Sequence, residues 1–184
     1  MPFAKESDFE SDMITLLFNN NWKQFYRVNR MPTDDDVVKA FNESWLIYKY
    51  AAGVLYLIES KIRDRRRHST QLLGLSKYSL EHIVPKKWRN HWAFEGDKAA
   101  MDYRDRKLLT LGNLTIITQA LNASIRDADW PTKKTGIGDK GGLRKYAEGI
   151  ETFSSYLDAE VWDERVIQER VKYLSNKALD IWSV

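Results

Sequence analysis

The stretch that decides the fold is SLEHIVPKKW (79–88), LGNLTIIT (111–118) and QALNASI (119–125). Strand-forming residues surround Glu81-His82, and Pro85 ends that run. A second β-rich run begins after Gly112-Asn113, and residues 119–125 then change to helix-compatible types. This order of two strands and a helix predicts a ββα unit over about residues 79–128.

The pair Glu81-His82 combines a carboxylate with an imidazole. A neutral imidazole can take a proton from water, and the resulting hydroxide can attack a phosphodiester. Glu81 is a hard oxygen ligand for Mg²⁺, and Asn122 adds an amide oxygen to the same ion. Such an ion would neutralise the scissile phosphate and stabilise the departing oxygen. Neighbouring side chains on a strand face opposite sides, so Glu81 and His82 share a site only if the strand ends or bends there.

Other polar and aromatic residues have two interpretations. Asn113 is either part of an ordinary Gly-Asn turn or a side chain whose amide fixes the loop that carries His82. His91 lies outside any strand pattern and is either incidental or an extra phosphate contact. Three tryptophans either stack bases or pack in the core: Trp88, Trp92 and Trp130.

Three motifs, EHIVP (81–85), GNLTIIT (112–118) and the later Asn122, resemble the HNH branch of the ββα-metal (His-Me finger) nucleases. The interval of nine from Asn113 to Asn122 is also typical of that branch. More narrowly, the chain resembles the C-terminal nuclease domain of GmrSD-type modification-dependent restriction enzymes, which SspE-like antiphage proteins share. The resemblance covers about residues 40–184 and includes Tyr48, Tyr50, Trp88, Trp130, Lys133, Lys134, Trp162, Ile167, Arg170, Leu174 and Trp182.

The resemblance implies a metal-dependent DNA endonuclease, nicking or cleaving, that acts in restriction or antiphage defence. By matching position, His82 is the general base and Asn113 orients the catalytic loop. Glu81 and Asn122 hold the ion, which is Mg²⁺, Mn²⁺ or another divalent ion. Lys133 or Lys134 matches a lysine that holds phosphate.

Two positions depart from the family pattern. Many HNH enzymes have histidine where this chain has Asn122, and glutamine often follows the proline where it has Lys86. Whole proteins of this kind carry an N-terminal nucleotide-hydrolysing sensor domain, which nothing here resembles. The expected partners are therefore DNA, including modified phage DNA, and a sensor domain or subunit.

Charge and composition narrow the classes further. The net charge is only +3, but basic residues gather on both sides of Glu81-His82. This distribution, with the family's lysine, predicts a DNA-binding set: Arg65, Arg66, Arg67, Lys86, Lys87, Arg89 and Lys134. The three arginines are alternatively a solvated helix end. The absence of cysteine excludes disulfides and thiolate zinc sites, and no apolar run is long enough to span a membrane, so a cytoplasmic protein is expected.

The chain of 184 residues is predicted to be mostly α-helical with a small β-hairpin, a helical domain enclosing a ββα-metal (HNH) core. An N-terminal helical extension (1–40) precedes a nuclease domain (41–184). Periodicity predicts helices at 6–20, from Val37 to near Ser44, and at 45–65, 98–106, 143–157 and 163–182. The acidic run Asp34-Asp35-Asp36 is a helix start or, alternatively, a metal site. The glycine-rich segment 136–142 lacks the phosphate-loop pattern and is predicted to be a surface loop.

Two rival functions remain open. One is a catalytically inactive module that only binds nucleic acid. The other is a helical domain that binds a protein partner. Loss of nicking in His82→Ala distinguishes an enzyme from a module, and a steep salt dependence of DNA binding identifies phosphate contacts.

Overall fold

The computed structural model describes residues 33–44, 46, 48–64, 72–146 and 150–182. The chain divides into two compact units, Met1–Asp36 and Val37–Val184. The described residues are mostly helical with two small antiparallel strand pairs, which confirms the predicted fold class at this level. The helix predicted at 6–20 and the three arginines Arg65, Arg66 and Arg67 lie outside the described residues.

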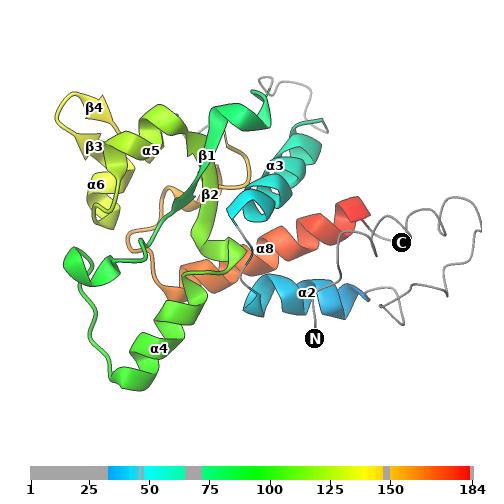
Figure 1. The fold of residues 1–184 in the computed structure, drawn as a ribbon, viewed down its shortest axis with the longest axis horizontal. Helices are drawn as coiled ribbons and strands as arrows, with labels where there is room; N and C mark the ends of the chain where they lie inside the picture. The colour runs from blue at the N-terminus through cyan, green and yellow to red at the C-terminus, as the bar shows by residue number, and fades with distance from the viewer. Residues whose placement is uncertain (1–32, 45, 47, 65–71, 147–149, 183–184) are drawn as a thin grey trace, which may run out of the picture. The chain divides into compact units, whose positions relative to one another are not determined.

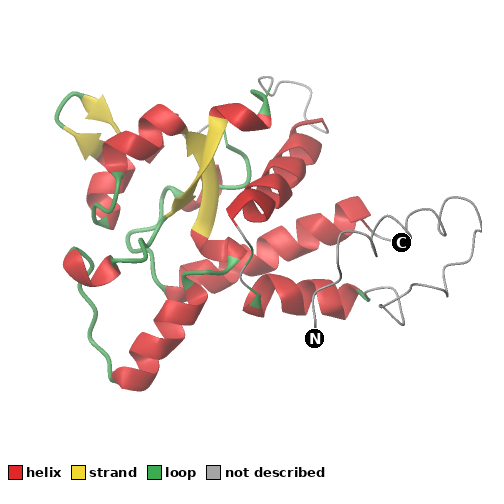
Figure 2. Ribbon diagram, viewed as in Figure 1, coloured by secondary structure: helices red, strands yellow, loops and turns green. Residues whose placement is uncertain are grey.

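Most of the described elements are helices, and the strands are short (Figures 1 and 2). The α-helices are α2 (Asp34–Glu43), α3 (Tyr48–Asp64), α4 (Lys98–Lys107), α5 (Gln119–Ile125), α6 (Trp130–Thr135), α7 (Leu143–Tyr146) and α8 (Glu164–Trp182). Short 3-10 turns are η1 (Leu75–Lys77), η2 (Trp88–Asn90), η3 (Leu111–Asn113) and η4 (Ser154–Tyr156). The strands are β1 (Tyr78–His82), β2 (Leu114–Thr118), β3 (Gly136–Ile137) and β4 (Lys140–Gly141).

Strands β1 and β2 form an antiparallel ribbon in which Glu81 lies opposite Thr115 and His82 lies opposite Leu114. Directly opposed side chains of an antiparallel pair share one face of the ribbon. One face therefore carries Leu80 and His82, and the other carries Ser79 and Glu81. Helices α3 and α5 both contact the ribbon, and α5 follows β2 directly, as the predicted ββα order requires (Figure 1).

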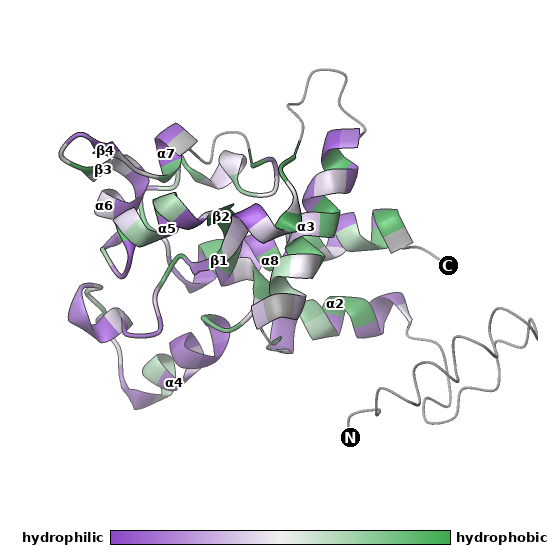
Figure 3. Cartoon of the chain, turned by 45° about the horizontal axis from the view of Figure 1, so that its top comes forward, coloured by the Kyte–Doolittle hydropathy of each residue, from purple (hydrophilic) through white to green (hydrophobic). Residues whose placement is uncertain are grey.

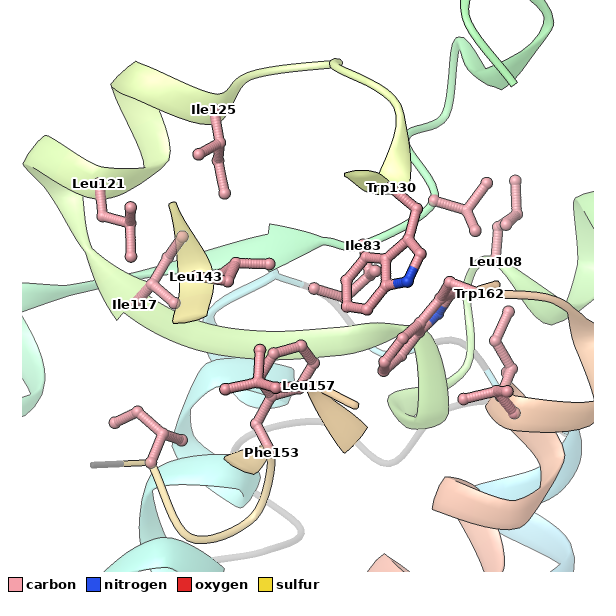
Figure 4. Close-up of a cluster of buried hydrophobic side chains, with 14 of the residues drawn as sticks. Ile83, Leu108, Ile117, Leu121, Ile125, Trp130, Leu143, Phe153, Leu157 and Trp162 are labelled. Carbon is pink, nitrogen blue, oxygen red and sulfur yellow. The ribbon is translucent and has the colours of Figure 1, made fainter. Parts of the chain in front are cut away.

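Each face of the ribbon belongs to a different hydrophobic cluster. Leu80, Leu114 and Ile116 pack with buried residues of α3 and α8: Ala51, Ala52, Leu55, Ile58, Val171, Leu174 and Ala178. Ile117 packs in the second cluster with Leu121, Ile125, Trp130, Leu143, Phe153, Leu157 and Trp162 (Figure 4). A two-stranded ribbon alone is marginal in water, so these two covers stabilise it. Each fully buried Leu or Ile side chain contributes roughly 1.5–3 kcal/mol.

Helix starts mostly agree with the sequence signals. Thr33 and Asp36 bond each other's backbone N–H reciprocally at the start of α2, so Asp34, Asp35 and Asp36 form an acidic first turn. Asp97 caps α4, and Asp163 accepts the Val166 N–H at the start of α8. The predicted helices at 98–106 and 163–182 are confirmed within a residue or so.

Two local predictions were wrong. Residues 143–157 are not one helix, because the buried carboxylate of Glu59 accepts the N–H groups of Glu151 and Thr152 and stabilises a turn there. A further short helix follows the ββα unit, since Asp129 accepts the Thr132 N–H at the start of α6, with Pro131 in its first turn.

The second concerns the glycine-rich segment, which forms the β3–β4 hairpin rather than an irregular loop. Gly136 has a φ of 95°, and a Cβ there would lie 1.9 Å from the Lys140 carbonyl oxygen. A glycine is therefore required at this position for the hairpin to close.

The helices differ in the hydropathy of their residues. Figure 3 colours much of α4 as hydrophilic, whereas α3 alternates between hydrophilic and hydrophobic residues. Among the described residues, no helix has both the length and the apolar character that a membrane span requires.

Candidate active site

Glu81 and Lys133 form a buried ion pair on one face of β1. The ammonium of Lys133 donates to the Glu81 carboxylate and, at 2.8 Å, to the carbonyl oxygen of His82. Glu81 is 6% exposed and Lys133 is fully buried. Burial raises the pKa of Glu81, and the ammonium of Lys133 opposes this rise. Burial likewise lowers the pKa of Lys133, opposed by Glu81.

Asn122 lies on the same face of the ribbon as Glu81. From α5, its amide nitrogen donates to the Ser79 hydroxyl at 2.9 Å and to the Leu80 carbonyl at 3.3 Å. Ser79 and Glu81 are two residues apart on β1 and therefore point the same way. Within the described residues, no hydrogen bond to the Asn122 amide oxygen is seen, so this oxygen is available for a ligand.

His82 ends β1 and lies on the opposite face from Glu81, where it lines a cavity together with Tyr48 of α3. Its half-buried side chain lines a cavity of about 190 Å³ with Leu46, Tyr48, Leu80, Lys86, Leu109 and Leu114. Burial, followed by the positive charges of Lys86 and Lys133, lowers the pKa of His82 to about 4. The imidazole is therefore neutral at physiological pH, in the form that can accept a proton.

Asn113 is fully buried and holds the segment that follows His82. Its amide oxygen accepts the Val84 N–H at 2.9 Å, and its amide nitrogen donates to the carbonyls of Val84 and Leu108 at 2.9 and 3.0 Å. The indole nitrogen of Trp162 donates to the same amide oxygen at 3.3 Å. The Asn113 carbonyl also accepts the Ile83 N–H at 3.0 Å. These bonds fix residues 83 and 84, which leave the end of β1.

Arg170 supports the η3 turn from behind, a role that sequence reasoning missed. It is fully buried on α8, and its guanidinium donates to the carbonyls of Leu111, Gly112, Leu114 and Thr152 at 2.6–3.1 Å. Gly112 lets η3 approach α8, since a Cβ there would lie 2.3 Å from the Ile167 carbonyl oxygen. The available signal was a charged residue on the inner face of an otherwise apolar helix pattern.

The sequence model of the C-terminal domain of GmrSD restriction endonucleases matches residues 31–177. The chain belongs to this family. It is therefore a nuclease domain related to restriction endonucleases, in a family that acts on DNA. No curated protein and no solved structure matches the chain.

In this GmrSD C-terminal domain, the structure gathers Glu81, Asn122 and Lys133 at one face of β1 and places His82 on the other. Two of the tryptophans considered for base stacking, Trp88 and Trp130, are each 3% exposed and pack in the core. Trp92 is half-buried and donates to the Ala128 carbonyl. Packing within the domain, rather than base stacking, therefore accounts for the positions of these three tryptophans.

The predicted DNA contacts differ in their surroundings. Lys86 and Lys87 are exposed just after β1. Arg89 is exposed, pairs with Asp105 at 2.9 Å and lies over the Trp88 ring. Lys134 is half-buried and donates to the Ala159 carbonyl at 3.0 Å. His91 is exposed, 3.8 Å from Asp127.

The residues at β1 offer two oxygen ligands to a divalent ion of the Mg²⁺ class. No group of three His, Cys, Asp or Glu side chains that could hold a metal occurs in the part of the chain that the structure describes. Glu81 and Asn122 nevertheless supply a carboxylate and an amide oxygen on one face. Mg²⁺ is commonly bound by one or two carboxylates, with water and substrate phosphate completing its shell. Such an ion must share Glu81 with the Lys133 ammonium or displace it.

Proposed function

We propose that this domain is an HNH-type, metal-dependent DNA endonuclease in which His82 is the general base. The observation that carries the proposal is the placement of a neutral, half-buried imidazole at the end of β1, open to a cavity beside Lys86 and followed by a loop that Asn113 holds. Family membership supports the reaction class, and this geometry supports His82 as the residue that would remove the proton.

His82 would act on a water molecule next to a phosphodiester at the β1 edge. A general base is most effective when its pKa lies near the working pH, and a pKa of about 4 makes the unliganded imidazole a weak base. A bound phosphodiester brings a negative charge that favours the imidazolium and raises this pKa. DNA binding would therefore activate the base that it needs.

Glu81 and Asn122 would hold Mg²⁺, Mn²⁺ or a similar divalent ion from the opposite face of the same strand. When bound, the ion supplies charge neutralisation of the scissile phosphate and of the departing oxygen. Lys133 holds Glu81 and the His82 carbonyl together, so it keeps the ligand and the strand end in register. Asn113 fixes the loop after His82, and Asn113→Ala should lower both thermal stability and nicking activity.

DNA would approach along the exposed basic residues after β1. Lys86, Lys87 and Arg89 are in position for phosphate contacts, with Arg65–Arg67 and Lys134 as further candidates. The domain would act in restriction or antiphage defence in the cytoplasm, with modified phage DNA as its substrate. It would work with a nucleotide-hydrolysing sensor domain or subunit. The chain itself would divide into an extension at 1–40 and a nuclease domain at 41–184.

The decisive experiment is a supercoiled-plasmid assay with Mg²⁺, Mn²⁺ or EDTA. Wild-type protein should nick or cut in the presence of a divalent ion and not in EDTA. His82→Ala should lose at least about a hundredfold in rate, as removal of a general base does, and added metal should not restore it. His91→Ala is the matched control, because it removes an exposed histidine in the following segment. Equal losses in the two variants would contradict the assignment.

Metal ligands are tested in the same assay. Glu81→Ala and Asn122→Ala should lose activity mainly through weaker metal binding, so a higher Mn²⁺ concentration should restore part of it. If His82→Ala were restored equally well, the division of roles between base and ligands would be wrong.

A second function is favoured by one specific observation, namely that Lys133 already pairs with Glu81. A domain in which this pair never opens would bind DNA without cutting it. Such a module would show salt-dependent DNA binding and no nicking with any divalent ion. A helical domain that serves a protein partner would show neither property.

A further inference from the structure

We propose that Tyr48 is a positioning residue for His82 and that it acts through its hydroxyl group. The inference deepens the proposed function, because it assumes that His82 performs the chemistry. Tyr48 is the first residue of α3 and reaches β1 across 32 positions of sequence. Its hydroxyl accepts the Leu80 N–H at 2.7 Å and donates to the Leu80 carbonyl at 3.3 Å.

This pair of bonds closes the outer edge of β1. The ribbon has two strands, so β1 has a partner strand only on one side, and an edge strand leaves alternate N–H and C=O groups open. At Leu80 both of these groups are taken by side chains, with Tyr48 on α3 and Asn122 on α5 sharing the carbonyl. Leu80 is thereby fixed between two helices.

Leu80 determines where the imidazole points. It lies two residues before His82, on the same face of the ribbon, and both side chains line the same cavity. A strand end held at Leu80 by Tyr48 and at residues 83 and 84 by Asn113 cannot twist freely between those points. His82 lies inside that clamped interval, so the Tyr48 hydroxyl restrains the direction of the base.

Tyr48 lines the same cavity as His82. Among the described residues that line this cavity, Lys86 carries a positive charge and no residue is acidic. The Tyr48 side chain is 51% exposed although its hydroxyl is anchored. A phosphodiester entering towards His82 and Lys86 would pass this ring. Base stacking on the exposed ring is the alternative role, and it requires the ring but not the hydroxyl.

The test separates the hydroxyl from the ring. Tyr48→Phe keeps the ring and removes the clamp, and Tyr48→Ala removes both. Tyr103→Phe is the matched control, since Tyr103 is 42% exposed on α4 and contacts Lys107 through its ring. Single-turnover nicking of plasmid with excess protein, DNA affinity by titration, and melting temperature are measured for each variant.

Tyr48→Phe should lower the single-turnover rate about ten- to a hundredfold, because small errors in the position of a catalytic group have effects of this size. Its DNA affinity and melting temperature should change little, and the Tyr103→Phe rate should match wild type. A Tyr48→Phe rate equal to wild type, with weaker DNA binding only in Tyr48→Ala, would assign the ring to stacking and overturn the proposal.

Amide hydrogen exchange at Leu80 tests the clamp without any reference to activity. The Leu80 amide should exchange at least about tenfold faster in Tyr48→Phe, because it loses its hydrogen-bond acceptor. Unchanged exchange would overturn the clamp. If wild-type protein nicks no DNA while Leu80 exchange accelerates, the clamp exists and the nuclease proposal fails, so the two outcomes are distinguishable.

Discussion

The buried frame behind the β1–β2 ribbon and the exposed edge of β1 use polar groups in opposite ways. In the frame, Asn113, Arg170 and Glu59 are fully buried, and each side chain hydrogen-bonds more than one backbone group. At the edge, His82 and Asn122 are half-buried and lie beside a cavity or a strand edge. The frame stabilises a single conformation, and the edge keeps groups available for a substrate.

The strongest way to test this contrast is Arg170→Met. The substitution removes the guanidinium donor from four buried carbonyls, at Leu111, Gly112, Leu114 and Thr152, of which Leu111 keeps the Leu114 N–H. Because buried unsatisfied groups and broken charged networks are costly, the free energy of unfolding should fall by about 4 kcal/mol. Urea denaturation measures it.

Arg165→Met is the matched control for Arg170→Met. Arg165 lies on the same helix, its side chain is 72% exposed, and it lies 3.6 Å from Glu169. Its removal should change stability by no more than about 0.5 kcal/mol. Similar effects of the two substitutions would show that the buried frame does not carry the stability assigned to it.

The next largest effect is expected where the two regions meet, at the Glu81–Lys133 pair. Lys133→Met leaves a buried carboxylate without its cation, which should lower the free energy of unfolding by about 3 kcal/mol. The double variant Glu81→Gln, Lys133→Met removes both charges and should recover most of that loss. A double variant as unstable as the sum of the single variants would mean that the two side chains do not interact.

A smaller effect is the pH dependence that His82 imposes on stability. Its pKa is lowered from 6.5 to about 4, mainly by burial and then by Lys86 and Lys133. The unfolded chain takes up a proton below pH 6.5, but the folded protein resists protonation. The neutral His82 therefore contributes fully to the free energy of unfolding above pH 6.5. This contribution is lost as the pH falls towards 4, and the loss is about 2 kcal/mol after allowance for solvent screening.

His82→Gln should remove this component of the acid destabilisation, and His91→Gln should retain it. Denaturation curves at several pH values between 4 and 7 measure the difference. If the slope of stability against pH is the same in wild type and His82→Gln, the imidazole is not held neutral by its surroundings.

The smallest stability effect is expected on the exposed side, at Arg89. Its pair with Asp105 is exposed and screened by solvent, so Arg89→Ala should change the free energy of unfolding only slightly. If Arg89 binds a phosphate, the same substitution should reduce the slope of log affinity against log salt by about 1. An unchanged slope would exclude Arg89 from the DNA contacts.

The sequence predicted those parts of the site that depend on local order. Pro85 and the β-rich runs located β1 and β2, and Gly112-Asn113 and the helix-compatible residues at 119–125 located the turn and the helix. Hydrophobic periodicity located α8 because a helix that packs along its length must repeat apolar residues every three to four positions. It failed at 143–157, where a carboxylate from distant α3 captures the backbone.

The sequence by itself determined the family and the mostly helical fold, since these follow from motif order and periodicity. Only the tertiary structure decided which partner each side chain has: Lys133 for Glu81, the η3 carbonyls for Arg170, and Leu80 for Tyr48. The reason is that each pair joins residues that are distant in sequence, so only the packing of the helices brings them together.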